Sequence, residues 1–323
     1  MIADPASGKR LLYVLGDMLT GESRMRREVL AALRATYGET YGEANVMIAG
    51  THTHATPGGT SEYSLYNVTT WGTHRDSFGA VKAGILQAVA RAEADLAPTQ
   101  VKASSSRLQG AGVNRSRLAF ELNPARVKDQ LPGGVDPTSA TLTFDRGGAT
   151  VGALNWFSTH PTSLTNKNTL ISTDNKGYAE WLWERGRAGV DYQKVAGGAV
   201  PAMVAGFAMS NGGDTSPNLN LKPGSGPTED QFENMRLIGQ REFEAAYGQL
   251  AGARREVSGP LDARIVYVDM QRQSAPAAFT GTGSEERTCR ATLGAPFGAG
   301  STEDGPGATF LNEATATAPS SPP

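Results

Sequence analysis

The chain contains little cysteine, few histidines and no surplus of either charge. Cys289 is the single cysteine among 323 residues, so no disulfide can form within the chain. Lysine and arginine together number 30, against 32 aspartates and glutamates, which leaves no basic surplus to hold a phosphate backbone. Nucleic acid is therefore excluded from the expected partners, and no protein partner is evident in the sequence.

Long hydrophobic runs are missing as well. The longest weakly polar stretch, residues 195–209, is too short to span a bilayer and is interrupted by Pro201. Residues 1–5 lack the basic, apolar and small-residue regions of a signal peptide, which makes the cytoplasm the expected location from these residues alone. An apolar share of 39%, with 39 glycines and 18 prolines, is typical of a loop-rich globular protein.

The apolar pattern alternates between strand-like runs and helix-like stretches, which predicts a mixed α/β fold. We expect a β-sheet core flanked by helices, with the active-site loops at the strand ends. The expected strands are residues 11–15, 45–49, 140–144, 150–157, 202–209 and 262–270, and the expected helices are residues 24–37, 76–94, 178–187 and 229–250. Residues 312–323 are rich in small polar residues and proline, and we expect them to form a disordered tail.

Reactive side chains are concentrated in loops that follow expected strands, at residues 51–59, 159–163 and 210–218. His52 and His54 stand two residues apart, and in extended chain both side chains point to the same side. Of the four histidines in the chain, His160 also follows an apolar run and only His74 lies outside this pattern. We therefore expect these loops to converge on one site.

The residues of these loops allow a functional and a plainer interpretation. Neutral imidazoles suit zinc, which in catalytic sites takes three protein ligands and a water, but loop histidines also simply hydrogen-bond to backbone. Ser216 lies in a glycine-rich turn and could act as a nucleophile if His54 served as its base, although ordinary turn hydrogen bonds explain such a serine equally well. Arg115 could bind a carbonyl oxygen or an oxyanion, or it could be a surface arginine.

The order and spacing of several motifs resemble the neutral ceramidase family. These motifs are Gly-Thr-His-Thr-His at 50–54, Asn-Arg-Ser at 114–116, Ser-Thr-His-Pro-Thr-Ser at 158–163, Ser-Thr-Asp-Asn-Lys-Gly-Tyr-Ala at 172–179 and Asn-Gly-Gly-Asp-Thr-Ser-Pro-Asn at 211–218. The resemblance continues through residues 288–290 and 298–307, and so covers nearly the whole chain.

The resemblance implies a zinc-dependent amidohydrolase that cleaves the amide bond of ceramide to give sphingosine and a fatty acid. It implies that His52 and His160 are ligands of one catalytic zinc ion, and that His54, Arg115 and Ser216 are catalytic. His54 would transfer protons, Arg115 would orient the amide or its oxyanion, and Ser216 would take part in the attack. Attack by water activated by zinc, with Ser216 assisting, is favoured over direct attack by Ser216.

The sequence also departs from the family pattern. Family enzymes complete the zinc site with a glutamate from a Pro-Gly-Glu segment and a tyrosine, and no residue here matches either; Asp17, Asp174 and Asp214 are weak substitutes. Residues 1–311 are expected to be a partial catalytic domain, truncated at both ends and lacking the family's immunoglobulin-like domain. Cys289 is similar to a family cysteine whose disulfide partner would lie in the missing part.

Two alternatives to an active zinc enzyme therefore stay open at this point. The chain could be a catalytically impaired fragment without a complete zinc site, or a zinc-independent serine amidase that uses Ser216 and His54. Ceramide is the expected substrate, together with peripheral contact with a membrane surface. The family suggests a secreted or cell-surface protein of sphingolipid metabolism.

Overall fold

The computed structural model describes residues 1–290 and 298–306, and these form two compact units. The first unit comprises residues 1–113 and 135–263, and the described part of the second comprises residues 114–134, 264–290 and 298–306. The boundary expected at residue 311 and the expected tail at 312–323 lie outside the described residues.

A five-stranded sheet forms the centre of the first unit. Its strands follow the order β10 (Arg255–Glu256), β4 (Gln100–Arg107), β6 (Thr138–Arg146), β7 (Ala149–Phe157) and β8 (Val204–Met209). Neighbouring strands are antiparallel except for β7 and β8, which run parallel with Phe157 opposite Met209. Both of these strands therefore end at the same edge of the sheet, where the loops at 158–163 and 210–218 begin.

A second, three-stranded sheet lies within the same unit. It consists of β1 (Ile2–Ala3), β2 (Arg10–Gly16) and β3 (Val46–Gly50), with β2 and β3 parallel and Gly16 opposite Gly50. The two-histidine loop follows β3 directly. Tyr13 of β2 contacts Trp156 of β7 with ring centroids 5.8 Å apart, so the two sheets pack against each other.

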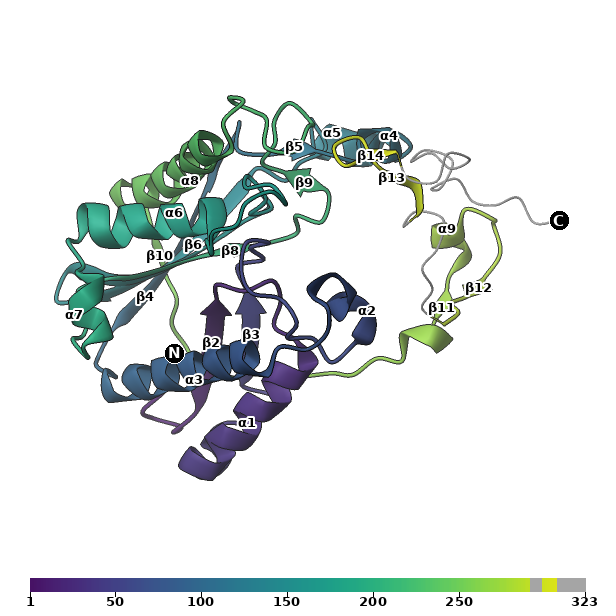
Figure 1. The fold of residues 1–323 in the computed structure, drawn as a ribbon. Coiled ribbons are helices and arrows are strands. Elements are labelled where there is room, and N and C mark those ends of the chain that lie inside the picture. Colours follow the sequence, from purple (N-terminus) through teal and green to yellow (C-terminus); the bar gives the residue numbers. More distant parts are fainter. Residues whose placement is uncertain (291–297, 307–323) are drawn as a thin grey trace. The chain divides into compact units, whose positions relative to one another are not determined.

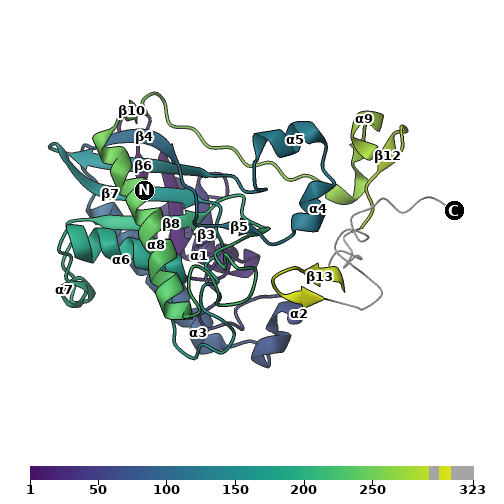
Figure 2. The same cartoon turned by 90° about the horizontal axis from the view of Figure 1, so that it is seen from above.

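Helices cover both sides of these sheets, as Figures 1 and 2 show for the first unit. α6 (Asp174–Trp181) and α8 (Gln231–Gly248) lie on the five-stranded sheet, and α1 (Ser23–Tyr37) and α3 (Arg75–Ala94) lie against β2 and β3. The helix α1 buries one stripe at helical spacing, formed by Met25, Val29, Leu30 and Leu33, which packs with Phe78, Ile85 and Val89 of α3. Truncation of Leu33 to alanine would cost about 2–5 kcal/mol because it would leave a cavity in this core.

The remaining elements are short. In the first unit they are α2 (Ser64–Asn67), α7 (Tyr192–Ala196), β9 (Thr215–Ser216) and the 3₁₀ turns Gly38–Thr40, Val68–Thr70 and Gln249–Ala251. The second unit contains α4 (Arg117–Glu121), α5 (Ala125–Gln130), α9 (Ala277–Thr280), the 3₁₀ turn Met270–Arg272, and the pairs β11 (Ser274–Ala275) with β12 (Glu286–Arg287) and β13 (Gly300–Ser301) with β14 (Gly305–Pro306). β5 (Val113–Asn114) stands at the boundary of the units.

The predicted mixed α/β class is confirmed, with two local corrections. Residues 262–269 form no strand, since their alternating side chains are mostly exposed and find no partner strand among the described residues. The helix expected at 178–187 begins four residues earlier, at Asp174, and continues as a π-helical turn over Leu182–Arg187. Its polar first turn hid this start, because the apolar pattern begins only at Tyr178.

Candidate metal centre and active site

Three of the four histidines converge where strands of the first unit end. His52 and His54 follow β3, and His160 stands three residues beyond the end of β7. One ring nitrogen from each histidine lies within 4.8 Å of the others, and the ring centroids of His52 and His160 are 4.9 Å apart. Among residues 1–290 and 298–306, these histidines form the group of side chains able to hold a metal ion.

Backbone carbonyls fix the proton positions of two of these rings. His52 Nδ1 lies 2.8 Å from the Leu19 carbonyl oxygen, and His160 Nδ1 lies 3.0 Å from the Thr215 carbonyl oxygen. Because a carbonyl oxygen can only accept, each Nδ1 carries a proton, and the lone pair of the neutral ring is then on Nε2. Histidines that ligate zinc show this arrangement, in which the second nitrogen donates to a carbonyl or carboxylate.

The backbone around His52 is unusual for a residue with a side chain. Its φ of 74° lies in the left-handed region, which non-glycine residues seldom adopt outside turns and functional sites. The N–H groups of Thr51 and His52 donate to the carbonyls of Gly16 and Met18, at 2.9 and 3.1 Å. A Cβ at Gly50 would lie 2.3 Å from the Met18 carbonyl oxygen, so only glycine allows the two segments to approach this closely.

Ser216 belongs to a loop that packs directly on the His160 segment. The Thr215 carbonyl accepts both the backbone N–H of His160 and its Nδ1–H, each at 3.0 Å. Ser216 is fully buried, and its Oγ accepts the N–H of Asn218 at 3.0 Å. A Cβ at Gly212 would lie 1.6 Å from the Ser158 carbonyl oxygen, which makes glycine necessary there too. His160 and Ser216 are thus brought together by backbone contacts between their two loops.

Arg115 belongs to the second unit, and the contacts described for it are with residues of that unit. Its guanidinium lies 3.8 Å from the Asp304 carboxylate, and its carbonyl accepts the N–H of Thr302 at 3.2 Å. The preceding Asn114 is buried; its Oδ1 accepts the N–H of Ser116 and its Nδ2 donates to the Gly134 carbonyl, both at 2.8 Å. The catalytic role of Arg115 stays a prediction.

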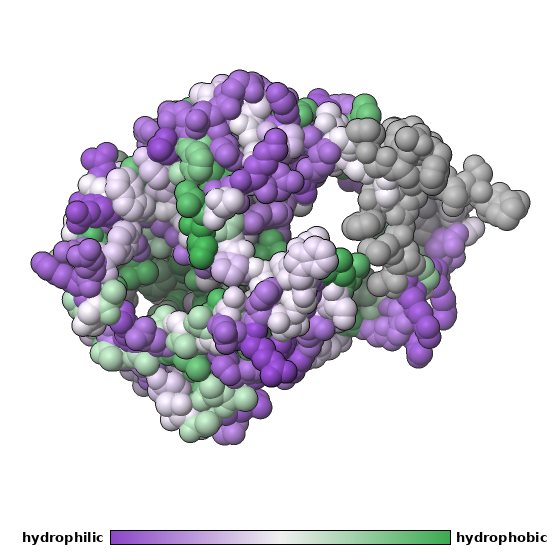
Figure 3. Space-filling model, viewed as in Figure 1, coloured by the Kyte–Doolittle hydropathy of each residue, from purple (hydrophilic) through white to green (hydrophobic). Residues whose placement is uncertain are grey.

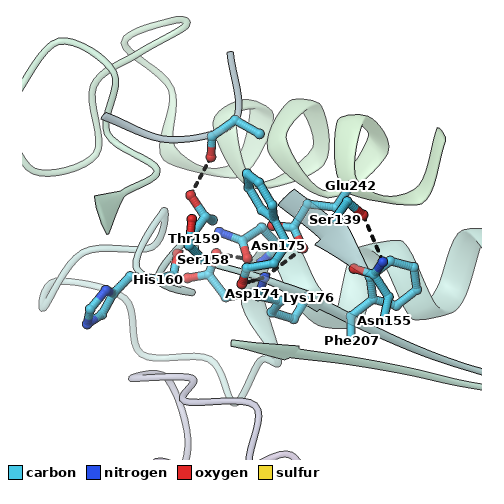
Figure 4. A network of polar contacts seen from close by, with 12 residues as sticks. Ser139, Asn155, Ser158, Thr159, His160, Asp174, Asn175, Lys176, Phe207 and Glu242 are labelled. Atoms are coloured by element: carbon cyan, nitrogen blue, oxygen red, sulfur yellow. Dashed lines mark hydrogen bonds and ion pairs between the residues drawn. The ribbon is translucent and has the colours of Figure 1, made fainter. Parts of the chain in front are cut away.

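A buried polar network behind His160 was not found from the sequence, and Figure 4 shows its members. Lys176 Nζ lies 2.8 Å from Glu242 Oε2 and 3.2 Å from the Phe157 carbonyl oxygen, with both side chains 0% exposed. The Asp174 carboxylate accepts the N–H groups of Ser163, Leu164 and Asn175. One signal was present, since Glu242 interrupts the apolar stripe of α8 between Ile238 and Ala246.

Burial is the largest influence on the pKa of both acids in this network. It raises the pKa of Asp174 to about 6, although the N–H donors from Leu164, Asn175 and Ser163 favour the charged form. Burial likewise raises the pKa of Glu242, with Lys176 acting in the opposite direction. The carboxylate of Asp174 is thus engaged with backbone amides, and among the described residues Asp17, Asp174 and Asp214 all stand outside the histidine group.

Sequence comparison relates the chain to known proteins. The sequence model described as neutral/alkaline non-lysosomal ceramidase, N-terminal, matches residues 1–321. The chain belongs to this family. It is 43% identical over 314 residues to the neutral ceramidase of Pseudomonas aeruginosa, covering 97% of this chain and 45% of that protein. It is also 44% identical over 300 residues to the neutral ceramidase of Mycobacterium tuberculosis, covering 92% of this chain and 46% of that protein.

Solved ceramidase structures share the fold. A structure titled "Ceramidase complexed with C2" matches with a TM-score of 0.83 at 42% identity, over 97% of this chain and 47% of that one. The crystal structure of neutral ceramidase from Pseudomonas aeruginosa matches with a TM-score of 0.79. This chain thus spans about half the length of the ceramidases that it matches. No helix among its described residues is long and apolar enough to cross a bilayer.

Proposed function

We propose that the chain provides His52 and His160 as zinc ligands in the active site of a neutral ceramidase, an amidohydrolase that cleaves ceramide to sphingosine and a fatty acid. One observation carries this proposal: the Nδ1 atoms of both histidines are held by backbone carbonyls, and the imidazoles converge. The donor set fits zinc, because neutral imidazole nitrogen is among its preferred ligands. Family membership supports the amidase reaction.

Each candidate site residue has a distinct role in this proposal. His52 and His160 would hold the ion through Nε2, and zinc there would polarise the amide carbonyl and make water acidic enough to react near neutral pH. His54, an exposed ring 5.1 Å from that of His52, transfers protons at the edge of the site. Ser216 assists the attack through its hydroxyl, and Arg115 orients the amide oxygen. Residues 1–311 then form the N-terminal part of the catalytic domain.

An exposed aromatic segment supports contact with the membrane that contains the substrate. Residues 63–73 carry no charged side chain, and they include the exposed residues Tyr63, Leu65, Tyr66, Val68 and Trp71. Trp71 is 98% exposed, and tyrosine and tryptophan are favoured where water meets lipid. On the face of the molecule seen in Figure 3, hydrophilic and hydrophobic residues are intermixed. A secreted or cell-surface location would bring this segment to ceramide.

Zinc stoichiometry and ceramide turnover test the proposal together. The purified chain should bind one zinc ion and hydrolyse a short-chain fluorescent ceramide, and chelation should abolish that hydrolysis. His52→Ala and His160→Ala should remove the zinc, whereas His74→Ala serves as the matched control because its Nε2 contacts the Thr70 carbonyl away from the cluster. Ser216→Ala should keep the zinc and lower the rate.

The possible results separate the alternatives. A wild-type chain that binds no zinc would overturn the metal site. Zinc binding without turnover would favour the catalytically impaired fragment, and turnover insensitive to chelators would favour a serine amidase using Ser216 and His54.

A further inference from the structure

The first turn of α6 presents three consecutive polar residues to the protein interior. Asp174, Asn175 and Lys176 are all buried, and each contacts a different part of the segment that carries His160. Lys176 donates to the carbonyl of Phe157, and Asp174 accepts from the amides of Ser163 and Leu164. Burial of polar groups is costly unless they are hydrogen-bonded, and the hydrogen bonds of all three side chains tie this turn to that segment.

Asn175 makes the contact closest to the candidate metal centre. Its Nδ2 donates one hydrogen to the His160 carbonyl at 3.0 Å and the other to Ser163 Oγ at 3.1 Å. The orientation of the amide is fixed by chemistry, because the His160 carbonyl can only accept and therefore requires the NH₂ group. Figure 4 shows the His160 ring projecting away from the polar network while the residue remains attached to it.

The opposite side of His160 is held by the Ser216 loop. Its backbone N–H and its Nδ1 both contact the Thr215 carbonyl at 3.0 Å. The Thr215 carbonyl therefore sets the rotation of the ring, while Asn175 fixes the backbone from which the ring extends. Loss of the Asn175 contact would leave the His160 carbonyl buried without this donor and let the peptide tilt.

We propose that Asn175 is a positioning residue of the metal centre, which holds the His160 backbone so that the His160 ring stays beside those of His52 and His54. This inference rests on the proposed metal site but concerns a residue outside the histidine group. The Lys176–Glu242 pair and the Asp174 carboxylate keep the first turn of α6 in place. Small errors in ligand placement reduce affinity strongly, which is why such supporting contacts matter.

The chain offers a matched control for this residue. Asn155 on β7 is 1% exposed and Asn175 is 0% exposed, and in each the Oδ1 accepts no hydrogen bond within the described part of the chain. Asn155 Nδ2 donates to Ser139 Oγ and Thr141 Oγ1, at 2.8 and 2.9 Å, inside the sheet. Asn155→Ala thus removes a comparable buried amide whose hydrogen bonds go to Ser139, Ala140 and Thr141 and not to the His160 segment.

The experiment compares metal binding rather than turnover. Zinc affinity is measured by competition with a chelating dye, and cobalt(II) added to the metal-free chain reports ligand geometry through its visible absorption. Asn175→Ala should weaken zinc binding roughly tenfold and alter the cobalt spectrum. Asn155→Ala should lose similar thermal stability yet bind both metals like the wild type.

Two further variants keep the test decisive. Ser163→Ala removes the second partner of Asn175 but spares its contact with His160, so wild-type affinity is expected. Asn175→Leu fills the same volume without a donor, and it replaces Asn175→Ala if the alanine variant does not fold. Equal affinity in wild type and Asn175 variants, or equal losses in Asn155→Ala or Ser163→Ala, would overturn the positioning role. A wild type that binds neither metal would instead overturn the metal site itself.

Discussion

Replacement of Lys176 by methionine is expected to lower the free energy of unfolding by about 3–5 kcal/mol, because it leaves a buried carboxylate without its counter-ion. Lys176 and Glu242 are both 0% exposed, and their charged atoms lie 2.8 Å apart. Glu242 Oε1 accepts no hydrogen bond in the described part of the chain, so Lys176 is the partner that compensates this charge. The Phe157 carbonyl would also lose a donor, although it keeps the N–H of Ser210.

A double-mutant cycle separates the cost of the unpaired buried charge from the cost of lost packing. Lys176→Met combined with Glu242→Leu removes both charges and keeps the volume apolar, so the double variant should recover most of the lost stability. Urea unfolding of the metal-free chain at pH 7.5 measures each free energy. In a domain of this size the single change should lower the Tm by about 10 °C, at about 2–4 °C per kcal/mol.

An exposed ion pair on the same helix provides the control. Arg236 lies 3.2 Å from Glu233 on α8, with both side chains about half exposed. Arg236→Met should therefore change stability by less than about 1 kcal/mol. A loss below about 1 kcal/mol for Lys176→Met, or a double variant as unstable as the sum of its single changes, would refute the reasoning from burial.

Two other predictions concern Asp174, in the first turn of α6, and Gly212, in the Ser216 loop. The pKa of Asp174 is raised to about 6 from the ordinary 3.8, so the folded chain retains a proton that the unfolded chain has lost between these pH values. Its contribution to the free energy of unfolding should therefore be present below about pH 4 and fall by about 3 kcal/mol as the pH rises through 6. Urea unfolding from pH 4 to 7 should show this fall in wild type relative to Asp174→Asn. A difference between the two proteins that stays constant with pH would contradict the prediction. Gly212→Ala should cost more than about 2 kcal/mol and displace the Ser216 loop, because its Cβ would meet the Ser158 carbonyl oxygen at 1.6 Å. Gly213→Ala, where a Cβ meets nothing within 4 Å, should be nearly neutral in the same unfolding assay, and equal losses would speak against steric exclusion.

The parts of the fold that follow from local apolar patterns were predicted well. The hairpin of β6 and β7 and the helices α1 and α3 lie within about two residues of their expected bounds, because each buries a stripe that recurs at its own period. The strand β4 was missed because its sequence is largely polar. Its Ser104 and Ser106 face the side chain of Gln249, at 2.8 and 2.9 Å, so hydrogen bonds replace apolar contacts on this part of the sheet. Periodicity of hydrophobic residues cannot reveal such a strand.

The histidine cluster was predicted because imidazoles are rare in this chain and follow strand ends. Their hydrogen-bond partners could not be predicted, because both are backbone carbonyls, of Leu19 and Thr215, which any residue could supply. Only the fold decides which carbonyls arrive there, through segments 33 and 55 residues away along the chain. The motifs thus located the histidines of the cluster but not the groups that orient them.

In the proposed metal site, the orientation of the histidine rings links stability to metal binding. His52 is held through the end of the β2–β3 pair, and His160 through the Ser216 loop and the first turn of α6. Each ring is therefore ordered by folding, so the free energy of metal binding does not have to offset the entropy lost when the ring is fixed. A loop ordered in this way favours tight binding only while its supports remain intact. Variants that loosen α6 should consequently lose metal before they lose the fold, whereas changes confined to the α1–α3 core should affect both together.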